Sequence, residues 1–328
     1  MTLKVPATGR AVSDPSPIDL ADPHFLPDML VDAFVGVNLT AFGAFPTDFP
    51  GDDAHGVTVE HLNLAHLLSS ISAAFHGGLD VVTLDRDFHT RSDADAQANA
   101  LDGVRTVVKI WERAKNFVPS ADNNNSRAAL CAEVPSDPDY IRQAVKILSD
   151  GEVKRASILI ALQDTSDFDD FEAAANEARA AGYKIWLVVT NPQLTLNYVD
   201  VVARIADVVR VRTTDRSLAR TLRFSLLEAG EKLGRKILVL ADLGVVISAS
   251  LQAAHERDIL VSQMIGHELF AGQSKIVGTV YDVADAIEGW IGAGAADGLI
   301  FTPASLPTDL ASLLKGVLPL ISARIKGH

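Results

Sequence analysis

Eight short apolar runs rich in Val, Ile and Leu recur along this chain, and they constrain its fold more than any other feature. Strands that are buried on both faces have this continuous apolar pattern. Amphipathic helical stretches separate most of the runs, and parallel strands need crossovers of that length. The pattern therefore predicts an α/β fold, a single TIM-type (β/α)8 barrel. The predicted strands are residues 34–40, 79–85, 128–134, 156–162, 184–190, 207–213, 236–243 and 297–303. A doubly wound open sheet is the alternative, because periodicity alone cannot show that a sheet closes.

Several helix ends are also encoded locally. Thr279 and Asp282 have the spacing of a capping box, and Asp137 before Pro138 predicts an N-cap followed by a first-turn proline. Three other helical stretches end at a glycine suited to a left-handed cap before the next strand: Gly182, Gly234 and Gly294.

Composition limits the class of protein. Hydrophobic residues make up 48% of the 328 residues, which is enough for a large core without metals or disulfides. Residues 1–30 are proline-rich and aperiodic, so we expect an N-terminal arm there and one barrel domain over residues 31–328. The single cysteine, the lack of a secretory signal and the lack of long apolar runs predict a cytoplasmic protein with no membrane segment. A net charge of −13 argues against a nucleic-acid partner.

The ligand of a β/α barrel lies at the C-terminal ends of its strands, so the residues that close each run are the candidates for a site. This expected rim is polar and partly acidic, and it offers no lysine placed for a Schiff base. Its members are Thr40, Phe42, Thr83, Asp85, Asp87, Glu133, Gln163, Asp164, Thr190, Asn191, Arg212, Asp242 and Thr302.

Two readings of the acidic members are open. Asp85, Glu133, Asp164 and Asp242 have the oxygen ligands that Mg²⁺ prefers, but they also suit helix caps or salt bridges at the barrel mouth, and we favour the second reading. Histidines fall on predicted helices and loops, with His61 and His66 on one helix as surface residues, so no metal site is expected. Phosphate-cradling glycine motifs are absent.

The fifth predicted strand is followed by "NPQLTLNYVDVVARIADVV", residues 191–209, in which two hydroxyl side chains lie near the start of a helix. Thr195 and Tyr198 lie near free N–H groups that favour an anion, so they are candidates to bind a phosphate. The alternative is that Thr195 caps the helix and Tyr198 packs on it.

Three segments together resemble the luciferase-like flavin monooxygenases, in particular the branch that contains nitrilotriacetate monooxygenase. They are "FHGGLDVVTLDRDF" at 75–88, "NPQLTLNYVDVVARIADVVRV" at 191–211 and "IVGTVYDVADAIEGWIGAGAADGLIFTPASLPTDLASLLKGVLPLI" at 276–321. The order and spacing of the last segment match the C-terminal signature of that family, although Leu320 stands where an acidic residue is usual.

The resemblance implies an enzyme that uses reduced FMN from a separate flavin reductase, with O₂, on a small organic substrate. It implies that Asp85 lies near the flavin ring and that Thr195 and Tyr198 hold the FMN phosphate. Thr40, Thr83, Thr190 and Asn191 would line the isoalloxazine. No residue is assigned as catalytic, and a homodimer is expected because relatives form one.

The chain also departs from that family. It lacks the large insertion after the fourth strand, its fourth strand is apolar, and its third strand runs into residues 133–136 without a histidine. An open pocket would expose a flavin to water. Two alternatives therefore stay open: a non-catalytic flavin-binding or interaction homologue, and a deazaflavin-dependent oxidoreductase.

Overall fold

The structure is a computed structural model, and it describes residues 33–39, 64–85, 100–114, 129–161, 168–265, 270, 272–306 and 308–327. Several predictions fall outside these ranges. They concern the N-terminal arm at 1–30, the rim residues Thr40, Phe42, Asp87, Gln163 and Asp164, and the side chains of His61 and His66. The boundary of the arm stays a prediction.

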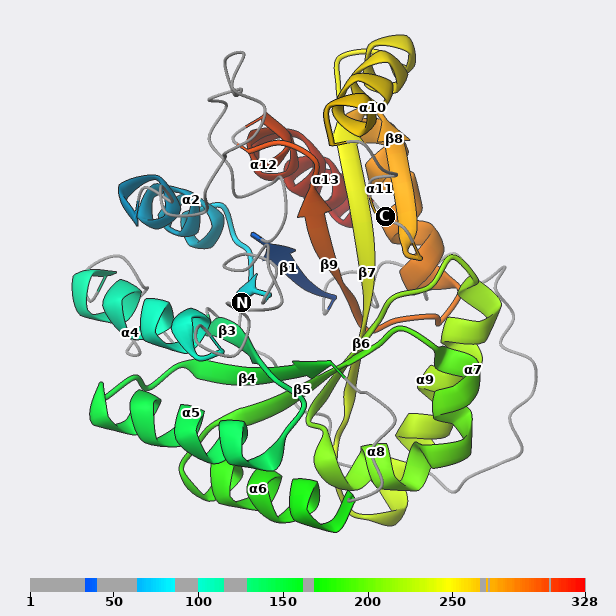
Figure 1. The fold of residues 1–328 in the computed structure, drawn as a ribbon. Helices are drawn as coiled ribbons and strands as arrows, with labels where there is room; N and C mark the ends of the chain where they lie inside the picture. Colours follow the sequence, from blue (N-terminus) through cyan, green and yellow to red (C-terminus); the bar gives the residue numbers. More distant parts are fainter. Residues whose placement is uncertain are drawn as a thin grey trace.

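Eight parallel strands close into a barrel, which confirms the predicted fold (Figure 1). Consecutive strands pair from β1 to β6, and β7 pairs with both β6 and β9, while β9 returns to β1. This closure excludes the open sheet. The barrel strands are β1 (Phe34–Asn38), β2 (Val81–Leu84), β3 (Ala129–Val134), β4 (Ala156–Ala161), β5 (Lys184–Val189), β6 (Val208–Val211), β7 (Leu238–Ile247) and β9 (Gly298–Pro303).

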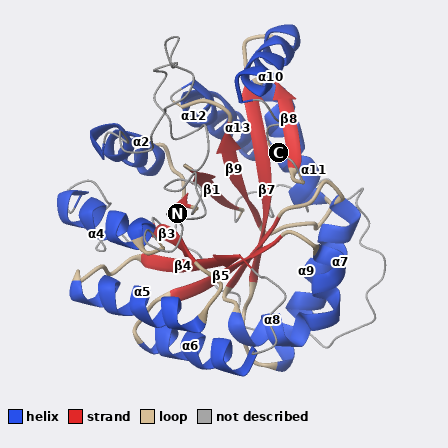
Figure 2. Ribbon diagram, in the orientation of Figure 1, coloured by secondary structure: helices blue, strands red, loops and turns tan. Residues whose placement is uncertain are grey.

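Helices surround the strands as an outer layer, as Figure 2 shows. Among the described residues none of them is long and apolar enough to cross a membrane. The helices are α2 (Leu64–His76), α4 (Asp102–Ala114), α5 (Pro138–Asp150), α6 (Phe168–Ala180), α7 (Pro192–Thr195), η4 (Leu196–Tyr198), α8 (Val199–Ile205), α9 (Arg216–Lys232), α10 (Leu251–Ile265), α11 (Val280–Gly292), α12 (Thr308–Ser312), η5 (Leu313–Val317) and α13 (Leu318–Gly327).

The helix-end predictions are confirmed. Asp137 caps α5 by accepting a hydrogen bond from the backbone of Asp139, and Thr279 and Asp282 form the capping box of α11. The three glycines after α6, α9 and α11 have left-handed backbone conformations, with φ of 89° at Gly182, 65° at Gly234 and 66° at Gly294. A side chain at these positions would be strained, so the sequence signal has a direct steric cause.

One strand was not predicted. The strand β8 (Ser274–Gly278) pairs with the C-terminal half of β7, on the edge that β6 occupies along its N-terminal half. In Figure 1, β7, β8 and α10 extend together beyond the rest of the barrel, near the top of the view. The run escaped detection because four of its five residues are only partly buried, so it lacks the strong apolar pattern of the barrel strands.

The barrel interior is filled by apolar side chains along most of its length. Val81, Cys131, Leu159, Val208 and Leu240 belong to one buried cluster inside the ring, separate from the larger core between strands and helices. At the N-terminal end of the strands the rings of Phe34 and Trp186 meet edge to face, 6.1 Å apart. The barrel is therefore a packed core rather than a channel, and the ligands of such barrels bind at the C-terminal ends of the strands.

Three aspartates fasten the N-terminal end of the barrel in the same way; we call Asp80, Asp207 and Asp297 the strand-start aspartates. Each directly precedes or begins a strand run, and each makes a two-way bond with one residue of the neighbouring strand. The carboxylate accepts the N–H of that residue at 2.8 Å, and the aspartate N–H donates to its carbonyl at 2.7 to 2.9 Å. The partners are Val35, Ile185 and Val239 respectively. Since the bonds go to backbone groups, this device fixes strand register.

Candidate active site

Four charged side chains meet at the C-terminal end of the barrel; we call Asp85, Arg210, Arg212 and Asp242 the mouth cluster. Arg210 and Arg212 are two residues apart on and just after β6, so both point inward. Arg210 donates from Nε and Nη2 to the two oxygens of Asp242, at 2.9 and 2.8 Å, and from Nη1 to Asp85 at 3.0 Å. Arg212 donates from Nε to Asp242 at 2.7 Å and from Nη2 to Asp85 at 2.5 Å. Each carboxylate thus bridges both guanidinium groups.

The mouth cluster is almost fully removed from water. The side chains of Arg210 and Asp242 are 0% exposed and that of Asp85 is 3% exposed, while Arg212 is 28% exposed at the upper edge. Unpaired charges at this depth would cost several kcal/mol each, so two positive and two negative groups must be present together. Asn38 supports the cluster by donating from Nδ2 to Asp85 at 2.8 Å.

The ionisation of the cluster follows from this pairing. Burial by itself would raise the pKa of the Asp85 carboxyl, but the charges of Arg210 and Arg212 outweigh burial and hold that pKa below its usual value. Burial would lower the pKa of Arg210, but Asp242 and Asp85 raise it above its usual value. Asp85 and Arg210 therefore stay ionised at neutral pH, and Asp85 does not serve as a proton donor there.

An apolar wall continues from the charged floor along β7. Gly244 and Val246 follow Asp242 on the same face of the strand, at steps of about 7 Å. The ring of Phe270 packs so closely on Gly244 that a β-carbon there would lie 2.3 Å from the ring. Phe270 has a φ of 66°, an uncommon conformation for a bulky residue, and like Val261 of α10 it packs against the buried pair Val246 and Ala304. The mouth thus combines charged groups at its base with an apolar side wall.

The predicted ring-lining residues that the structure describes, Thr83, Thr190 and Asn191, lie at this end of the barrel and are buried to different depths. Thr83 is fully buried, with its hydroxyl 3.4 Å from Nη1 of Arg210, so it supports the floor. Thr190 and Asn191 follow β5 and are exposed, and the Asn191 side chain caps α7 by accepting from the N–H of Leu194 at 3.1 Å. Thr302 is buried on β9, opposite Gly244. The assignment of flavin contacts to these residues stays a prediction.

The two predicted phosphate ligands lie further from the centre. Thr195 is 4% exposed, and its hydroxyl donates to the carbonyl of Asn191 at 2.9 Å. Tyr198 is 39% exposed and packs its ring on Phe168, with centroids 5.7 Å apart. These are the contacts of the packing alternative, although neither contact prevents a second hydrogen bond to a ligand. Their role in binding phosphate stays a prediction.

Two acidic residues of the expected rim, Asp85 and Asp242, are salt-bridge partners. Two of the four possible Mg²⁺ ligands, Asp85 and Asp242, have their oxygens engaged by arginine. Within the described ranges, no group of three or more histidine, cysteine and carboxylate side chains is arranged to hold a metal ion. Burial raises the pKa of the Cys131 thiol well above its usual value, so this cysteine inside the barrel stays protonated and unreactive.

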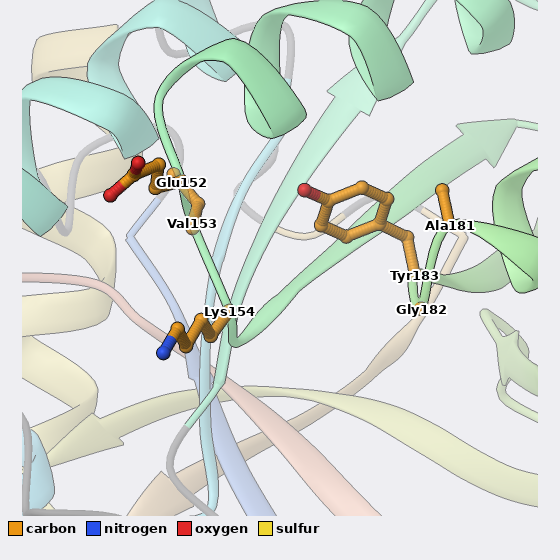
Figure 3. Close-up of a pocket in the computed structure, with 6 residues that line it drawn as sticks. All are labelled: Glu152, Val153, Lys154, Ala181, Gly182 and Tyr183. Atoms are coloured by element: carbon orange, nitrogen blue, oxygen red, sulfur yellow. The ribbon is translucent and has the colours of Figure 1, made fainter.

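A shallow groove lies at the opposite end of the barrel. It has a volume of about 500 Å³ and lies between the loops that precede β4 and β5. Figure 3 shows its six lining residues, Glu152, Val153, Lys154, Ala181, Gly182 and Tyr183. Ligands of β/α barrels bind at the other end, and this groove holds no cluster of catalytic groups, so we do not assign it the active site.

Sequence comparison identifies no relative. No protein-family profile matches the chain, and no curated protein matches it. Structural comparison, in contrast, finds solved structures with a similar fold. An EDTA monooxygenase from Chelativorans sp. BNC1 superposes with a TM-score of 0.64 at 13% identity, over 89% of this chain and 94% of that one. The fold is that of the luciferase-like monooxygenases.

Two further structures show the range of chemistry on this fold. A riboflavin lyase, solved with modified FMN and its substrate riboflavin, superposes with a TM-score of 0.60 at 12% identity, over 89% of this chain and 92% of that one. The coenzyme F420-dependent tetrahydromethanopterin reductase from Methanopyrus kandleri gives a TM-score of 0.56 at 10% identity, over 88% of this chain and all of that one. The resemblance inferred from the sequence is thus confirmed for the fold.

Sequence reasoning missed Arg210, the centre of the cluster. Asp85, Arg212 and Asp242 were expected at the rim because they close strands, whereas Arg210 lies within one. The signal was the alternation Val-Arg-Val-Arg at residues 209–212, which puts two arginines on one face of a strand that is otherwise apolar. An inward pair of arginines requires two inward carboxylates.

Proposed function

We propose that this chain is a flavin-dependent oxidoreductase of the luciferase-like type, and specifically a monooxygenase that uses reduced FMN and O₂ on a small organic substrate. One observation carries the proposal: a buried, salt-bridged Arg–Asp cluster lies under an apolar wall at the C-terminal mouth of the barrel. Structural neighbours with this fold are a monooxygenase and an enzyme that was solved with modified FMN.

The residues present fit a flavin. An isoalloxazine is flat, with apolar faces and one edge rich in carbonyl and nitrogen acceptors. The mouth offers guanidinium donors at its floor and, at its side, the half-buried ring of Phe270, which covers Gly244 and packs near the buried Val246. Ligand sites commonly combine a mostly apolar lining with a few placed polar groups. A site built for a bare metal ion or for a nucleophilic cysteine would need other residues.

The flavin would supply the oxygen chemistry, and the chain would bind it, orient it and exclude water. Asp85 and Asp242 would act by holding Arg212 in place, because both carboxylates are committed to guanidinium groups. Thr195 and Tyr198 are the proposed phosphate contacts, and a separate flavin reductase is the proposed source of reduced FMN. A homodimer and a cytoplasmic location also remain proposals.

A deazaflavin-dependent reductase is the second candidate, because one structural neighbour depends on coenzyme F420. Such an enzyme would transfer hydride without O₂. The two candidates differ in cofactor preference, which can be measured before any substrate is known.

Anaerobic calorimetric titration with oxidised FMN, reduced FMN and F420 tests the proposal. We expect saturable binding of FMN, with the reduced form tighter; a preference for F420 would support the second candidate. Failure to bind any of the three would reject the flavin proposal.

Thr195→Ala tests the phosphate contact, with Thr221→Ala as a matched control, because both hydroxyls donate to the carbonyl four residues earlier in a helix. Equal FMN affinity in both variants would reject Thr195 as a ligand.

A further inference from the structure

The two arginines of the mouth cluster differ in how many guanidinium nitrogens donate to a carboxylate of the cluster. Arg210 uses Nε, Nη1 and Nη2 in bonds to Asp242 and Asp85, and it is fully buried. Arg212 uses only Nε and Nη2, and no hydrogen bond from its Nη1 is found within the described residues. Since Arg212 is the partly exposed member, the spare donor belongs to the group that borders the mouth.

The orientation of Arg212 is fixed before any ligand arrives. Asp242 holds its Nε and Asp85 holds its Nη2, so the guanidinium plane is tied at two points. Both carboxylates are in turn anchored by Arg210, and Asp85 also by Asn38. A donor held this way needs no reorganisation on binding, which makes its bond to a ligand more favourable than that of a free arginine.

The charge balance selects the class of ligand group. Arg210 and Arg212 are matched by Asp85 and Asp242, so the cluster has no net charge to attract a phosphate dianion. Glu133, at the end of neighbouring β3, adds a further carboxylate to this region. One oriented N–H donor without excess positive charge suits a carbonyl or ring-nitrogen edge with delocalised negative charge better than a compact anion.

We infer that Arg212 is the specificity residue that binds the pyrimidine edge of the flavin through Nη1 and favours its reduced form. The inference rests on the proposed function and deepens it. Reduction adds electrons to the ring system and makes this edge a stronger acceptor, so a fixed guanidinium binds the reduced form more tightly. Because reduced FMN binds more tightly, the chain would bind mainly flavin that a reductase has already reduced.

The test compares the dissociation constants of oxidised and reduced FMN, measured anaerobically, in wild type and three variants. Arg212→Gln removes the charge. Arg212→Lys keeps the charge, but its single nitrogen cannot reproduce the bonds that two guanidinium nitrogens make to Asp242 and Asp85. Arg324→Gln is the control. Arg324 lies on α13, its side chain is 29% exposed, and like Arg212 it pairs with two carboxylates, those of Asp285 and Glu288. Circular dichroism establishes that each variant is folded.

We expect wild type to favour reduced FMN, and Arg212→Gln to lower that preference by about tenfold, the scale of a lost charged hydrogen bond. A tenfold change corresponds to a midpoint potential about 30 mV more negative for a two-electron couple. Arg212→Lys should lose part of the preference, and it replaces Arg212→Gln if the latter fails to fold. Arg324→Gln should match wild type.

Two results would overturn the inference separately from the proposed function. Equal affinity of wild type for both forms of FMN, or an unchanged preference in a folded Arg212 variant, would remove the role of Arg212 while leaving a flavin protein. No binding of FMN to wild type would reject the proposed function and the inference together.

Discussion

The strand-start aspartates and the aspartates of the mouth cluster lie at opposite ends of the barrel and form different kinds of hydrogen bond. At the N-terminal end, the carboxylates of Asp80, Asp207 and Asp297 accept backbone N–H groups of the next strand. At the C-terminal end, those of Asp85 and Asp242 accept only side-chain donors in the bonds described above. Backbone bonds tie strands together whatever the ligand, whereas a side-chain network can hold donors toward a ligand. The difference separates residues that maintain the fold from residues that shape the site.

This separation explains why the resemblance predicted the fold so well. The motifs "GGLDVV", "ARIADVV" and "GAADGL" each contain one strand-start aspartate. The likeness of these motifs to another family therefore indicates how neighbouring strands of the barrel are aligned. They lie at the end of the barrel opposite the mouth. Such motifs establish architecture, while activity must be argued from the mouth cluster.

The largest effect is expected from Arg210→Met. It leaves two buried carboxylates with Arg212 as their sole guanidinium partner within the cluster, so the free energy of unfolding should fall by about 3–5 kcal/mol. Urea unfolding followed by circular dichroism measures the change. Arg210→Met combined with Asp242→Leu should recover part of the loss, because it removes a buried charge that the single variant leaves poorly matched. A single variant as stable as wild type would mean that the cluster is not desolvated.

A smaller loss is expected at the other end from Asp297→Ala. The change leaves the N–H of Val239 without its carboxylate acceptor and removes the ion-pair partner of the mostly buried Arg223, which donates to Asp297 at 2.6 Å. The free energy of unfolding should fall by about 2–3 kcal/mol, with the FMN affinity of the folded protein unchanged. Asp285→Ala is the control, since its carboxylate is 67% exposed and its pair with Arg324 should contribute less than about 1 kcal/mol. A weakened FMN affinity in folded Asp297→Ala would contradict the division between the two ends.

The smallest effect is a pH dependence that comes from Asp85. Its pKa is lowered in the folded state, so its contribution to stability is fully present above the unfolded-state pKa of about 3.9 and is lost as pH falls through the lower folded-state pKa. The stability difference between wild type and Asp85→Asn should therefore shrink below about pH 4. Urea unfolding of both proteins between pH 3 and pH 7 measures it. A difference that grows in acid would mean that the folded-state pKa is raised.

The sequence predicted the barrel strands and helix ends because their signals are local. Continuous apolar runs identify strands, and glycine after a helix marks a left-handed cap, as at Gly182 and Gly234. The strand β8 was missed because its pairing depends on the extension of β7, which only the folded chain reveals.

The candidate site was predicted less completely for the same reason. Strand ends identify Asp85, Arg212 and Asp242 as rim residues, but the sequence does not state which charges pair. Arg210 and Asp85 are 125 residues apart, and their contact depends on barrel closure. The apolar side wall was also missed, because Phe270 lies outside any strand and is placed by its contact with Gly244.

Amide hydrogen exchange with and without reduced FMN, under anaerobic conditions, tests the central claim most directly. The account predicts that FMN slows exchange in the segments around Asp85, Arg212 and Gly244, at the mouth, and leaves the N-terminal end of the barrel unchanged. Protection confined to the groove at Glu152–Lys154 and Ala181–Tyr183, or no protection anywhere, would contradict it.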